Sequence, residues 1–479
     1  MSVSAPLFAA IEEYCQLSGL RLHMPGHAGC KEAFPQAFHD IVSLDLTEIV
    51  GLDDLHSPAG PIQAAQALLA RAYGARASYF LVNGASSGIH SLFLGLDAGA
   101  KVLVPRNAHR AFFAGMVLSG AHPVYIPCQV DHMGFALAVE PQQIAQLLSA
   151  NNDVAAAFLV SPSYYGTTCH VSRITELLKN LDIPLLVDEA HGGHFYFHPQ
   201  YPGTALGGGA DAAINGLHKT LPVLTQGACL HMGQTGLAAE RFVKACSLLT
   251  TTSPSYLIMA SIDLARDWME RHGRQALDRA LNLSHYYRQK INSIKGINTL
   301  FQELMITGVE AVDPLKVMIS VQDLAIDGFT ISRLLREEWH IQVEWESRHA
   351  ILAMMSVFHH QKDWERLFQA LRQIAKQAGY RRFAAEPPPA MPHPRVLMSP
   401  REAFFAFKRG VPFKDSINHI AGEMVVPYPP GIPCLLPGEM ITPEVYSYLQ
   451  EMIRSGVRLQ GPNSPNLDQI SIIDEQEFL

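Results

Sequence analysis

Short apolar runs alternate with stretches of helical periodicity from about residue 61 to residue 220. Six runs predict strands: Ala77–Val82, Lys101–Val104, Pro123–Ile126, Ala155–Val160, Pro184–Val187 and Ala212–Ile214. Most are separated by stretches that predict helices: Gly88–Leu96, Ala111–Ser119, Pro141–Leu148 and Ser172–Asn180. Alternation of strand and helix at this spacing is typical of a mainly parallel sheet with helices on both faces. The pattern therefore predicts an α/β fold.

The regions on either side of this alternation differ from it. A short helix is expected near Leu7–Leu17, and residues 242–291 predict a long helix that breaks at Thr251–Pro254. Pro387, Pro388 and Pro389 lie in a stiff, proline-rich stretch that is typical of a linker. We predict five segments: an N-terminal segment at 1–60, a large α/β domain at 61–294, a small α+β domain at 295–385, a linker at 386–395 and a C-terminal domain at 396–479.

Charge and composition narrow the class of protein. The net charge is −8 without any basic block, which argues against a nucleic-acid partner. There is no window of eighteen apolar residues, so no membrane span is expected. The N-terminus lacks the basic start and apolar core of a signal peptide. The seven cysteines include no C-x-x-C pair, which indicates a reducing, cytoplasmic environment.

Two short segments suggest chemistry when they are taken together. Asp188 ends an apolar strand, and Lys219 follows about thirty residues later between His218 and Thr220. A lysine at such a position is usually a solvated surface residue, and an aspartate after a strand is often a turn or helix cap. In this order and spacing, however, they match the needs of pyridoxal phosphate, whose aldehyde carbon is held by a lysine and whose ring nitrogen is kept protonated by an acid. We therefore expect this cofactor.

Three further segments are candidates for holding it. Ser86 and Ser87 lie in a Gly/Ser turn that follows a strand and opens a helix, where amides and hydroxyls bind phosphate, although a plain capped turn has the same sequence. His109 follows another strand and could stack on a flat ring, or be an ordinary loop histidine. Thr252 lies in a hydroxyl-rich cluster ahead of a helix, which is either a cap or a phosphate contact.

His191 and His194 allow a different interpretation. Together with Asp188 their spacing would permit a metal site. No cluster of further ligands supports zinc, so we expect no metal.

With these residues in view, the chain closely resembles the bacterial-type ornithine/lysine/arginine decarboxylases, in their short form. The matching segments are His23–His27, Leu44–Glu48, Asp53–Leu55, Asn83–Gly84, Val187–His191, His218–Pro222, Thr252–Tyr256, Pro427–Pro433 and Pro437–Glu439. They span nearly the whole chain, including the C-terminal domain that is special to this family. The resemblance implies the aspartate-aminotransferase fold (fold type I) and pyridoxal phosphate as cofactor. It makes 61–294 the cofactor-binding domain.

The resemblance also assigns roles to single residues. Lys219 looks like the lysine that binds the cofactor, Asp188 like the partner of its ring nitrogen and His109 like the stacking group. Ser86, Ser87 and His218 stand where the family holds the phosphate, and Thr252 is similar to a residue that reaches the neighbouring subunit's cofactor. His191 joins Lys219 and Asp188 as a candidate catalytic residue, because a proton can return to the substrate from the lysine or from a nearby histidine. Glu423 and Asp53 are candidate substrate ligands.

The resemblance implies a homodimer, or a larger homo-oligomer, that decarboxylates a basic amino acid within polyamine metabolism, with arginine favoured over lysine and ornithine. The chain departs from the family pattern at Ala28, Gly216 and Asn418-His419, where lysine, serine and Gly-Arg are usual. Two alternatives remain open at this point: another reaction of a fold-type I enzyme, such as a transaminase or lyase, and a non-catalytic regulatory paralogue.

Overall fold

The computed structural model describes residues 4–17, 19–235, 237–380, 391–392, 394–428 and 432–474. The chain divides into two compact units. Unit 1 comprises Met1–Gly95 and Pro184–Gln275, and unit 2 comprises Leu96–Ile183 and Ala276–Leu479. The predicted linker at 386–395 lies mostly outside the described residues, as does part of the family-matching segment Pro427–Pro433. Among the described helices, none has both the length and the apolar character needed to cross a bilayer.

Unit 1 contains a set of four strands in the order β1-β10-β9-β8. The strands are β1 (Ala77–Leu81), β8 (Leu185–Asp188), β9 (Ala212–Asn215) and β10 (Ala228–Met232). The helices are α1 (Pro6–Gln16), α2 (His39–Leu44), α3 (Pro61–Ala72), α4 (Gly84–Leu94), α8 (Ala239–Leu249) and α9 (Tyr256–Trp268). The predicted break in the long helix is confirmed, since α8 ends before Thr251 and α9 begins after Pro254.

The direction of the strands decides where the chemistry of unit 1 lies. β8 and β9 are parallel, with Asp188 opposite Ile214, so both strands end at the same edge. β10, which the hydrophobic pattern did not predict, pairs antiparallel with both β9 and β1. α4 packs against β1, β9 and β10. The close packing of α4 on these strands depends on Gly88, where an added Cβ would lie 2.6 Å from Leu81 and 2.7 Å from Ile214.

Unit 2 begins with three parallel strands, β2 (Lys101–Pro105), β3 (His122–Ile126) and β6 (Val154–Val160). Helices α5 (Arg110–Ser119), α6 (Pro141–Ala150) and α7 (Val171–Lys179) follow three of the predicted stretches closely. Two short antiparallel pairs accompany them: β4 (Gln129–Val130) with β5 (Ala136–Ala138), and β7 (Thr167–Cys169) with β12 (Val309–Val312). The prediction of an α/β fold with a mainly parallel sheet is thus confirmed, with β10 as an antiparallel strand.

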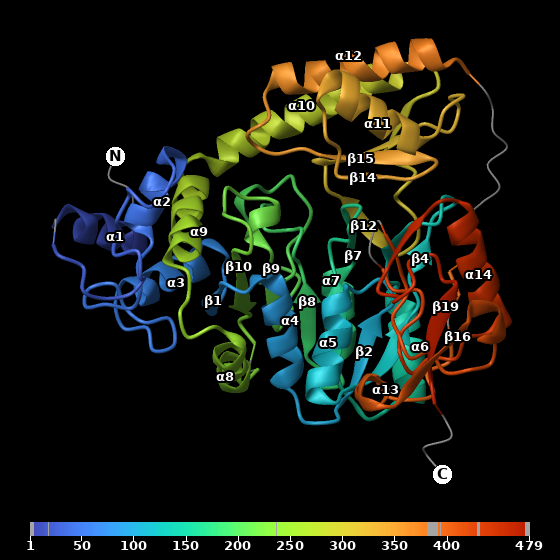
Figure 1. Ribbon diagram of the computed structural model, residues 1–479, viewed down its shortest axis with the longest axis horizontal. Helices are drawn as coiled ribbons and strands as arrows, with labels where there is room; N and C mark the ends of the chain where they lie inside the picture. Colours follow the sequence, from blue (N-terminus) through green and yellow to red (C-terminus); the bar gives the residue numbers. More distant parts are fainter. Residues whose placement is uncertain are drawn as a thin grey trace. The chain divides into compact units, whose positions relative to one another are not determined.

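The predicted small α+β domain has an antiparallel sheet in the order β11-β13-β15-β14. Its elements are β11 (Asn298–Leu300), β13 (Lys316–Ser320), β14 (Trp345–Glu346), β15 (Ala350–Met354), α10 (Arg274–Asn292), α11 (Gly328–Trp339) and α12 (Gln361–Ala378). The three helices lie over one side of β14 and β15 (Figure 1). Tyr287, Val317, Ile351, Trp364 and Leu371 belong to the buried apolar cluster between the helices and the sheet.

The last part of the chain forms its own apolar core, which includes Val411, Val425, Leu435, Ile441 and Leu449. Two antiparallel pairs and two helices surround it: β16 (Lys408–Pro412) with β19 (Gln469–Ile473), β17 (Val426–Tyr428) with β18 (Arg458–Gln460), α13 (Pro400–Phe405) and α14 (Pro443–Arg454). We refer to residues 396–474 as the C-terminal domain. It packs on α5 of the same unit through α13.

Candidate active site

Asp188 and Lys219 come from the ends of the two parallel strands of unit 1. Asp188 is the last residue of β8, and β9 leads directly into a single 3-10 turn, Leu217–Lys219, that carries the lysine. The backbone N–H of Lys219 closes this turn on the carbonyl of Gly216. The lysine Nζ lies 3.1 Å from Nε2 of His191. The structure therefore brings together Lys219 and His191 at the edge where open α/β sheets bind ligands.

The Asp188 carboxylate is buried, with 7% of the residue exposed. Burial raises its pKa, while the nearby Lys219 charge and the Ala190 N–H, 3.1 Å from Oδ1, act in the opposite direction. A buried carboxylate of this kind is stabilised as an anion by a cationic N–H partner. The protonated ring nitrogen of pyridoxal phosphate is such a partner, so this environment fits the predicted role.

Glu189 lies one residue further on and serves a separate buried cluster. Its carboxylate accepts hydrogen bonds from Tyr196 Oη at 2.6 Å, the Ala205 N–H at 2.7 Å and Asn215 Nδ2 at 3.2 Å. Burial raises the pKa of Glu189 to about 7, against the lowering effect of these donors. Sequence reasoning gave Glu189 no role. The structure shows that it ties the segment after β8 to Asn215, which Gly216 alone separates from the turn that carries Lys219.

The proposed phosphate residues lie around the N-terminus of α4. Gly84 begins this helix with a φ of 79°, a left-handed conformation that favours glycine. Ser86 and Ser87 lie in its first turn, where backbone N–H groups and the helix dipole favour an anion. The Ser87 hydroxyl already donates to the Gly84 carbonyl at 2.8 Å, so Ser86 has the more available hydroxyl.

His218 approaches the same helix end through the neighbouring segment. Its Nδ1 donates to the Gly227 carbonyl at 3.1 Å, and a Cβ on Gly84 would lie 3.9 Å from the Gln226 carbonyl. Burial lowers the pKa of His218. With Nδ1–H committed to Gly227, the neutral ring presents Nε2 as an acceptor, so direct contact with a phosphate needs the protonated form.

Thr252 is exposed in the turn between α8 and α9. The N–H of its neighbour Thr251 lies 3.5 Å from Asn83 Oδ1, which connects this turn with the start of α4. Thr220, next to the lysine, contains a buried hydroxyl that has no hydrogen-bond partner among the described residues. Such an unsatisfied group is expected where a polar ligand binds. The buried acid, the lysine, the helix N-terminus and this hydroxyl together fit pyridoxal phosphate.

The structure also explains a glycine at position 216, where the family pattern usually has serine. An added Cβ would lie 3.0 Å from the Ala190 carbonyl and 3.3 Å from Cδ of Lys219. A serine here would require the Ala190 loop or the lysine to move by a few tenths of an ångström. The glycine therefore permits a close approach between the loop that carries His191 and the turn that carries Lys219.

His109 belongs to unit 2 and is the N-cap of α5. Its Nδ1 accepts a hydrogen bond from the Ala111 N–H at 3.2 Å, so the proton of the neutral ring resides on Nε2. The residue is exposed. This hydrogen bond fixes one edge of the imidazole.

The carboxylates of the two predicted substrate ligands, Asp53 and Glu423, accept hydrogen bonds from the backbone. The Asp53 carboxylate accepts backbone N–H groups from Asp54, Ala59, Gly60, Ile62 and Gln63. The carboxylate of Glu423 accepts the Asn463 and Ser471 N–H groups, both at 2.8 Å. Both acids therefore organise loops of their own chain, and their role as substrate ligands stays a prediction. A sequence cannot distinguish an acid that caps backbone amides from one that binds a cationic ligand.

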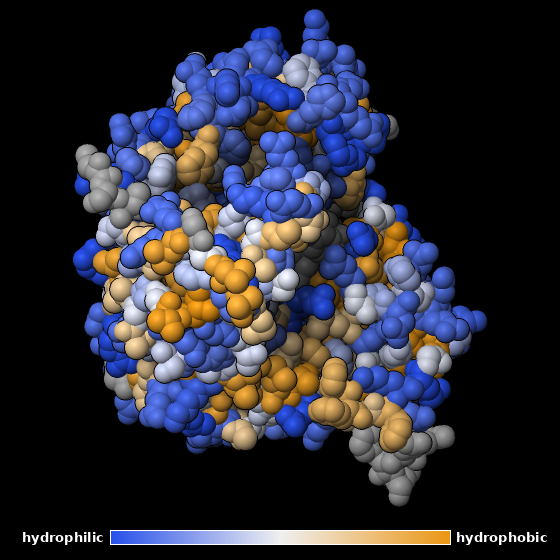
Figure 2. Space-filling model, turned by 60° about the vertical axis from the view of Figure 1, so that its left-hand side comes forward, coloured by the Kyte–Doolittle hydropathy of each residue, from blue (hydrophilic) through white to orange (hydrophobic). Residues whose placement is uncertain are grey.

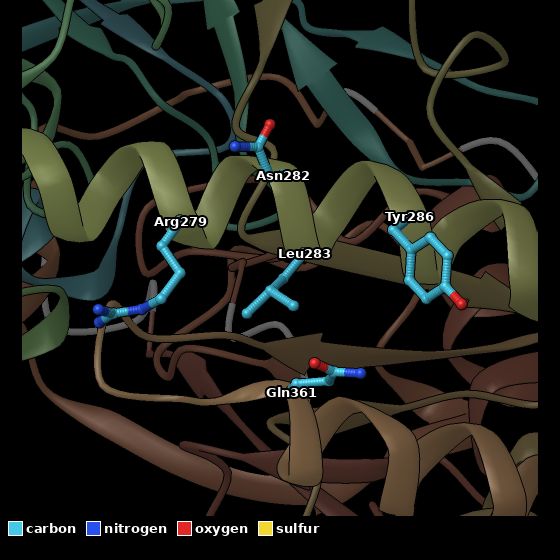
Figure 3. A pocket seen from close by; sticks show the side chains of 5 residues that line it. All are labelled: Arg279, Asn282, Leu283, Tyr286 and Gln361. Carbon is cyan, nitrogen blue, oxygen red and sulfur yellow. The ribbon is translucent and has the colours of Figure 1, made fainter.

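A pocket of about 550 Å³ lies elsewhere, between α10 and the start of α12. Arg279 and Leu283 point from α10 toward the end of α12 that carries Gln361 (Figure 3). Its lining includes neither a lysine nor a carboxylate, and Arg279 donates to the Val357 carbonyl at 2.9 Å. This pocket has none of the chemistry gathered around Lys219.

Comparison with known proteins agrees with this site. Residues 5–363 match the family model described as Orn/Lys/Arg decarboxylase, major domain, and residues 388–462 match the C-terminal domain of the same family. The chain is 35% identical to the arginine decarboxylase of Bacillus subtilis, over 99% of both chains. It is also 35% identical to the arginine decarboxylase of Halalkalibacterium halodurans, over 99% of this chain and 98% of that one.

Solved structures show the same fold. The constitutive lysine decarboxylase of Escherichia coli is similar with a TM-score of 0.85 at 19% identity, over 98% of this chain and 82% of the other. The ureidoglycine-glyoxylate aminotransferase of Bacillus subtilis is similar with a TM-score of 0.54 at 13% identity, over 68% of this chain and 87% of the other. The predicted fold class is confirmed. The chain therefore belongs to the Orn/Lys/Arg decarboxylase family.

Proposed function

We propose that this protein is a pyridoxal-phosphate-dependent decarboxylase that converts arginine to its amine and CO2. The observation that carries the proposal is the pairing of Lys219 with His191, 3.1 Å apart, beside the buried carboxylate of Asp188. Full-length relatives that are arginine decarboxylases support arginine over lysine and ornithine. A transaminase or a regulatory paralogue is not favoured, because the family match includes the decarboxylase C-terminal domain.

The chemistry divides between cofactor and protein. When bound, pyridoxal phosphate supplies a conjugated ring that takes up the electron pair left on the α-carbon as CO2 departs. Asp188 keeps the ring nitrogen protonated, which strengthens this uptake. Lys219 holds the cofactor until the substrate amine displaces it. Its freed Nζ and the neighbouring His191 Nε2 can then return a proton to the α-carbon.

The remaining residues position the cofactor. The N-terminus of α4 with Ser86 and Ser87 binds the phosphate, and His218 adds a donor when protonated. His109 would stack on the ring. Thr252 contributes at the edge of the same phosphate site, from this chain or from a second copy.

We also propose that the protein is a homodimer in the cytoplasm. Figure 2 shows patches of apolar side chains on the face that it turns forward. The N-terminal segment exposes large apolar side chains, among them Leu20 at 84%, Leu22 at 86% and Val50. Large exposed apolar side chains favour an interaction surface, and a second copy is the partner that the fold type implies. All seven cysteines are free, which supports a reducing compartment.

The proposed function is tested by the visible absorbance of the protein with pyridoxal phosphate and by CO2 release from arginine, lysine and ornithine in parallel. The wild type should show a visible band and release CO2 fastest from arginine. Lys219→Ala should lose the band and at least about 10³-fold of kcat. Lys244→Ala, which removes an exposed lysine of α8, is the matched control and should behave as wild type.

Other outcomes discriminate the alternatives. A visible band with a keto acid product in place of CO2 would indicate another reaction of the same cofactor. If the wild type shows no band at saturating pyridoxal phosphate, the protein is a non-catalytic paralogue.

A further inference from the structure

A buried ion pair joins the C-terminal domain to the segment that carries His109. Arg106 Nη1 and Nη2 donate to the two carboxylate oxygens of Glu439 at 2.5 and 2.9 Å. The two side chains are only 3% and 1% exposed. The residues lie 333 positions apart in the sequence. A bidentate pair of this kind fixes both the distance and the plane of the guanidinium.

The Arg106 end of the pair is held from several sides. Nη2 also donates to the Cys434 carbonyl at 3.0 Å, and the guanidinium lies 4.8 Å from the centre of the Tyr125 ring. Burial opposes the charge, but the Glu439 carboxylate outweighs it and raises the pKa of Arg106. Arg106 directly follows β2, and only Asn107 and Ala108 separate it from His109. Any displacement of the guanidinium is therefore transmitted through a very short segment.

The Glu439 end is rigid as well. Glu439 Oε2 accepts the Leu436 N–H at 2.8 Å, and the Glu439 carbonyl accepts the Ala421 N–H at 2.8 Å. The preceding Gly438 has a φ of 92°, and a Cβ there would lie 2.6 Å from the Met398 carbonyl. Leu436 lines a small crevice together with Arg106 and His109. The segment before Glu439 thus packs against the start of α5.

The C-terminal domain is fastened to α5 at a second place. Arg401 Nη1 donates to the Val117 and Leu118 carbonyls, at 3.2 and 3.0 Å. These carbonyls lie at the far end of the helix, whereas His109 caps its beginning. The C-terminal domain therefore contacts both ends of α5. The contact at the beginning of the helix adjoins His109, and the Arg401 contact lies at the other end.

Stability alone does not account for the ion pair. Removing two charges from water costs about as much as their attraction returns, and buried pairs replaced by apolar residues of similar volume often leave stability unchanged. A bidentate pair does, however, specify geometry that apolar packing does not. The position of this pair, three residues before His109, indicates what that geometry serves.

We infer that Arg106 and Glu439 are positioning residues through which the C-terminal domain sets the orientation of the His109 ring. This inference rests on the proposed function, because it takes His109 to be the group that stacks on the cofactor. It gives the C-terminal domain of this chain a specific part in the proposed reaction: it orients the His109 ring without touching the reacting atoms.

The test compares three variants. Glu439→Asp keeps the charge but draws the carboxylate back by one methylene. Arg106→Met/Glu439→Leu removes the whole pair with similar volume, and Arg401→Met removes the contact at the far end of α5. In each variant we would measure the melting temperature, the visible circular dichroism of bound pyridoxal phosphate, its Kd, and kcat with arginine. His109→Ala provides the reference for a lost stacking group.

A positioning role predicts that both pair variants approach His109→Ala. Their visible circular dichroism should fall, Kd should rise about tenfold and kcat should fall on the order of 10- to 100-fold. Arg401→Met should keep the wild-type spectrum and kcat. The inference is overturned if the pair variants retain wild-type spectra and Kd while only their melting temperatures change, or if Arg401→Met causes the same spectral loss.

A second measurement reads the His109 ring without the cofactor. In cofactor-free protein, the rate at which diethyl pyrocarbonate modifies His109, followed by mass spectrometry of the peptide, should change at least about threefold in Glu439→Asp and remain unchanged in Arg401→Met. An unchanged rate in Glu439→Asp contradicts the inference even if the double variant fails to fold. If the modification rate changes but the wild type binds no pyridoxal phosphate, the proposed function fails while the coupling between the domain and His109 stands.

Discussion

At the residue scale, surroundings decide what each acid of this chain does. Asp188 is buried beside a lysine, and its pKa is raised chiefly by burial. Asp53 is only partly buried. Burial acts to raise its pKa, but the hydrogen bonds that its carboxylate accepts from backbone N–H groups have the larger effect and lower it. The first carboxylate is held at a cost in stability, as expected for a residue kept for chemistry, and the second stabilises the start of α3.

The same substitution should therefore have opposite effects on stability at these two sites. In cofactor-free protein at pH 7, Asp188→Asn should raise the melting temperature, because it removes a buried charge. It should lower kcat by about 100-fold or more, because the ring nitrogen loses its anionic partner. Asp53→Asn should lower the free energy of unfolding by about 1–2 kcal/mol, because an amide cannot accept on both sides. Thermal unfolding and steady-state kinetics check both variants.

The contributions of Asp188 and Asp53 to stability should change with pH in opposite directions. A raised pKa in the folded state means that the contribution of Asp188 to stability is full below its ordinary value of 3.8 and is lost as the pH rises through the folded pKa. The advantage of Asp188→Asn should consequently disappear in acid. For Asp53 the lowered pKa reverses the rule, so its contribution is present above 3.8 and is lost as the pH falls. A stabilising effect of Asp188→Asn that persists below pH 3.8 would contradict this account.

At the element scale, α4 is held close to the strands by the absence of a side chain. Gly88 faces Leu81 of β1 and Ile214 of β9, and there is no space for a methyl group between them. The N-terminus of the same helix carries Ser86 and Ser87. The packing of one glycine therefore sets the depth at which the proposed phosphate site lies.

Gly88→Ala should lower the free energy of unfolding by about 1–3 kcal/mol through overpacking. It should also weaken the binding of pyridoxal phosphate, since α4 must move away from β1 and β9. Gly203→Ala is the matched control, because a Cβ there meets nothing within 4 Å. Chemical denaturation and cofactor titration would measure both effects. Wild-type stability in Gly88→Ala would show that the side chains around it repack freely.

At the scale of the whole molecule, exposed apolar residues of the N-terminal segment are the main basis for the proposed homodimer. Leu20 and Leu22 are each more than four-fifths exposed in the single chain. Leaving such side chains in water is unfavourable by about 25 cal/mol for each Å² of apolar surface. A second copy that covers them would remove this penalty.

Leu20→Glu/Leu22→Glu should convert the dimer to a monomer, because it would bury two charges in the interface. Sedimentation velocity of the wild type and the variant checks this prediction. Leu181→Glu, which changes an exposed leucine of unit 2, should leave the mass unchanged. A wild type that sediments as a monomer at micromolar concentration would refute the dimer.

The sequence by itself determined the features that depend on near neighbours. The alternation of strands and helices, the helix break before α9, and the lysine and acid of the proposed cofactor site all follow from local patterns. The hydrophobic pattern needs only a few residues to distinguish a strand from a helix. The order Asp188, then His218 and Lys219, needs only the chain itself.

The tertiary structure alone decided the features that join distant residues. In the folded chain, the carboxylates of Asp53 and Glu423 accept hydrogen bonds from backbone amides. β10 lies antiparallel between β1 and β9, and Arg106 pairs with Glu439, 333 positions away. A carboxylate has the same sequence signature whether it binds an amide, a guanidinium or a substrate. Its hydrogen-bond partner is whichever group the folded chain brings within about 3 Å of it, and a local sequence pattern does not determine that distance.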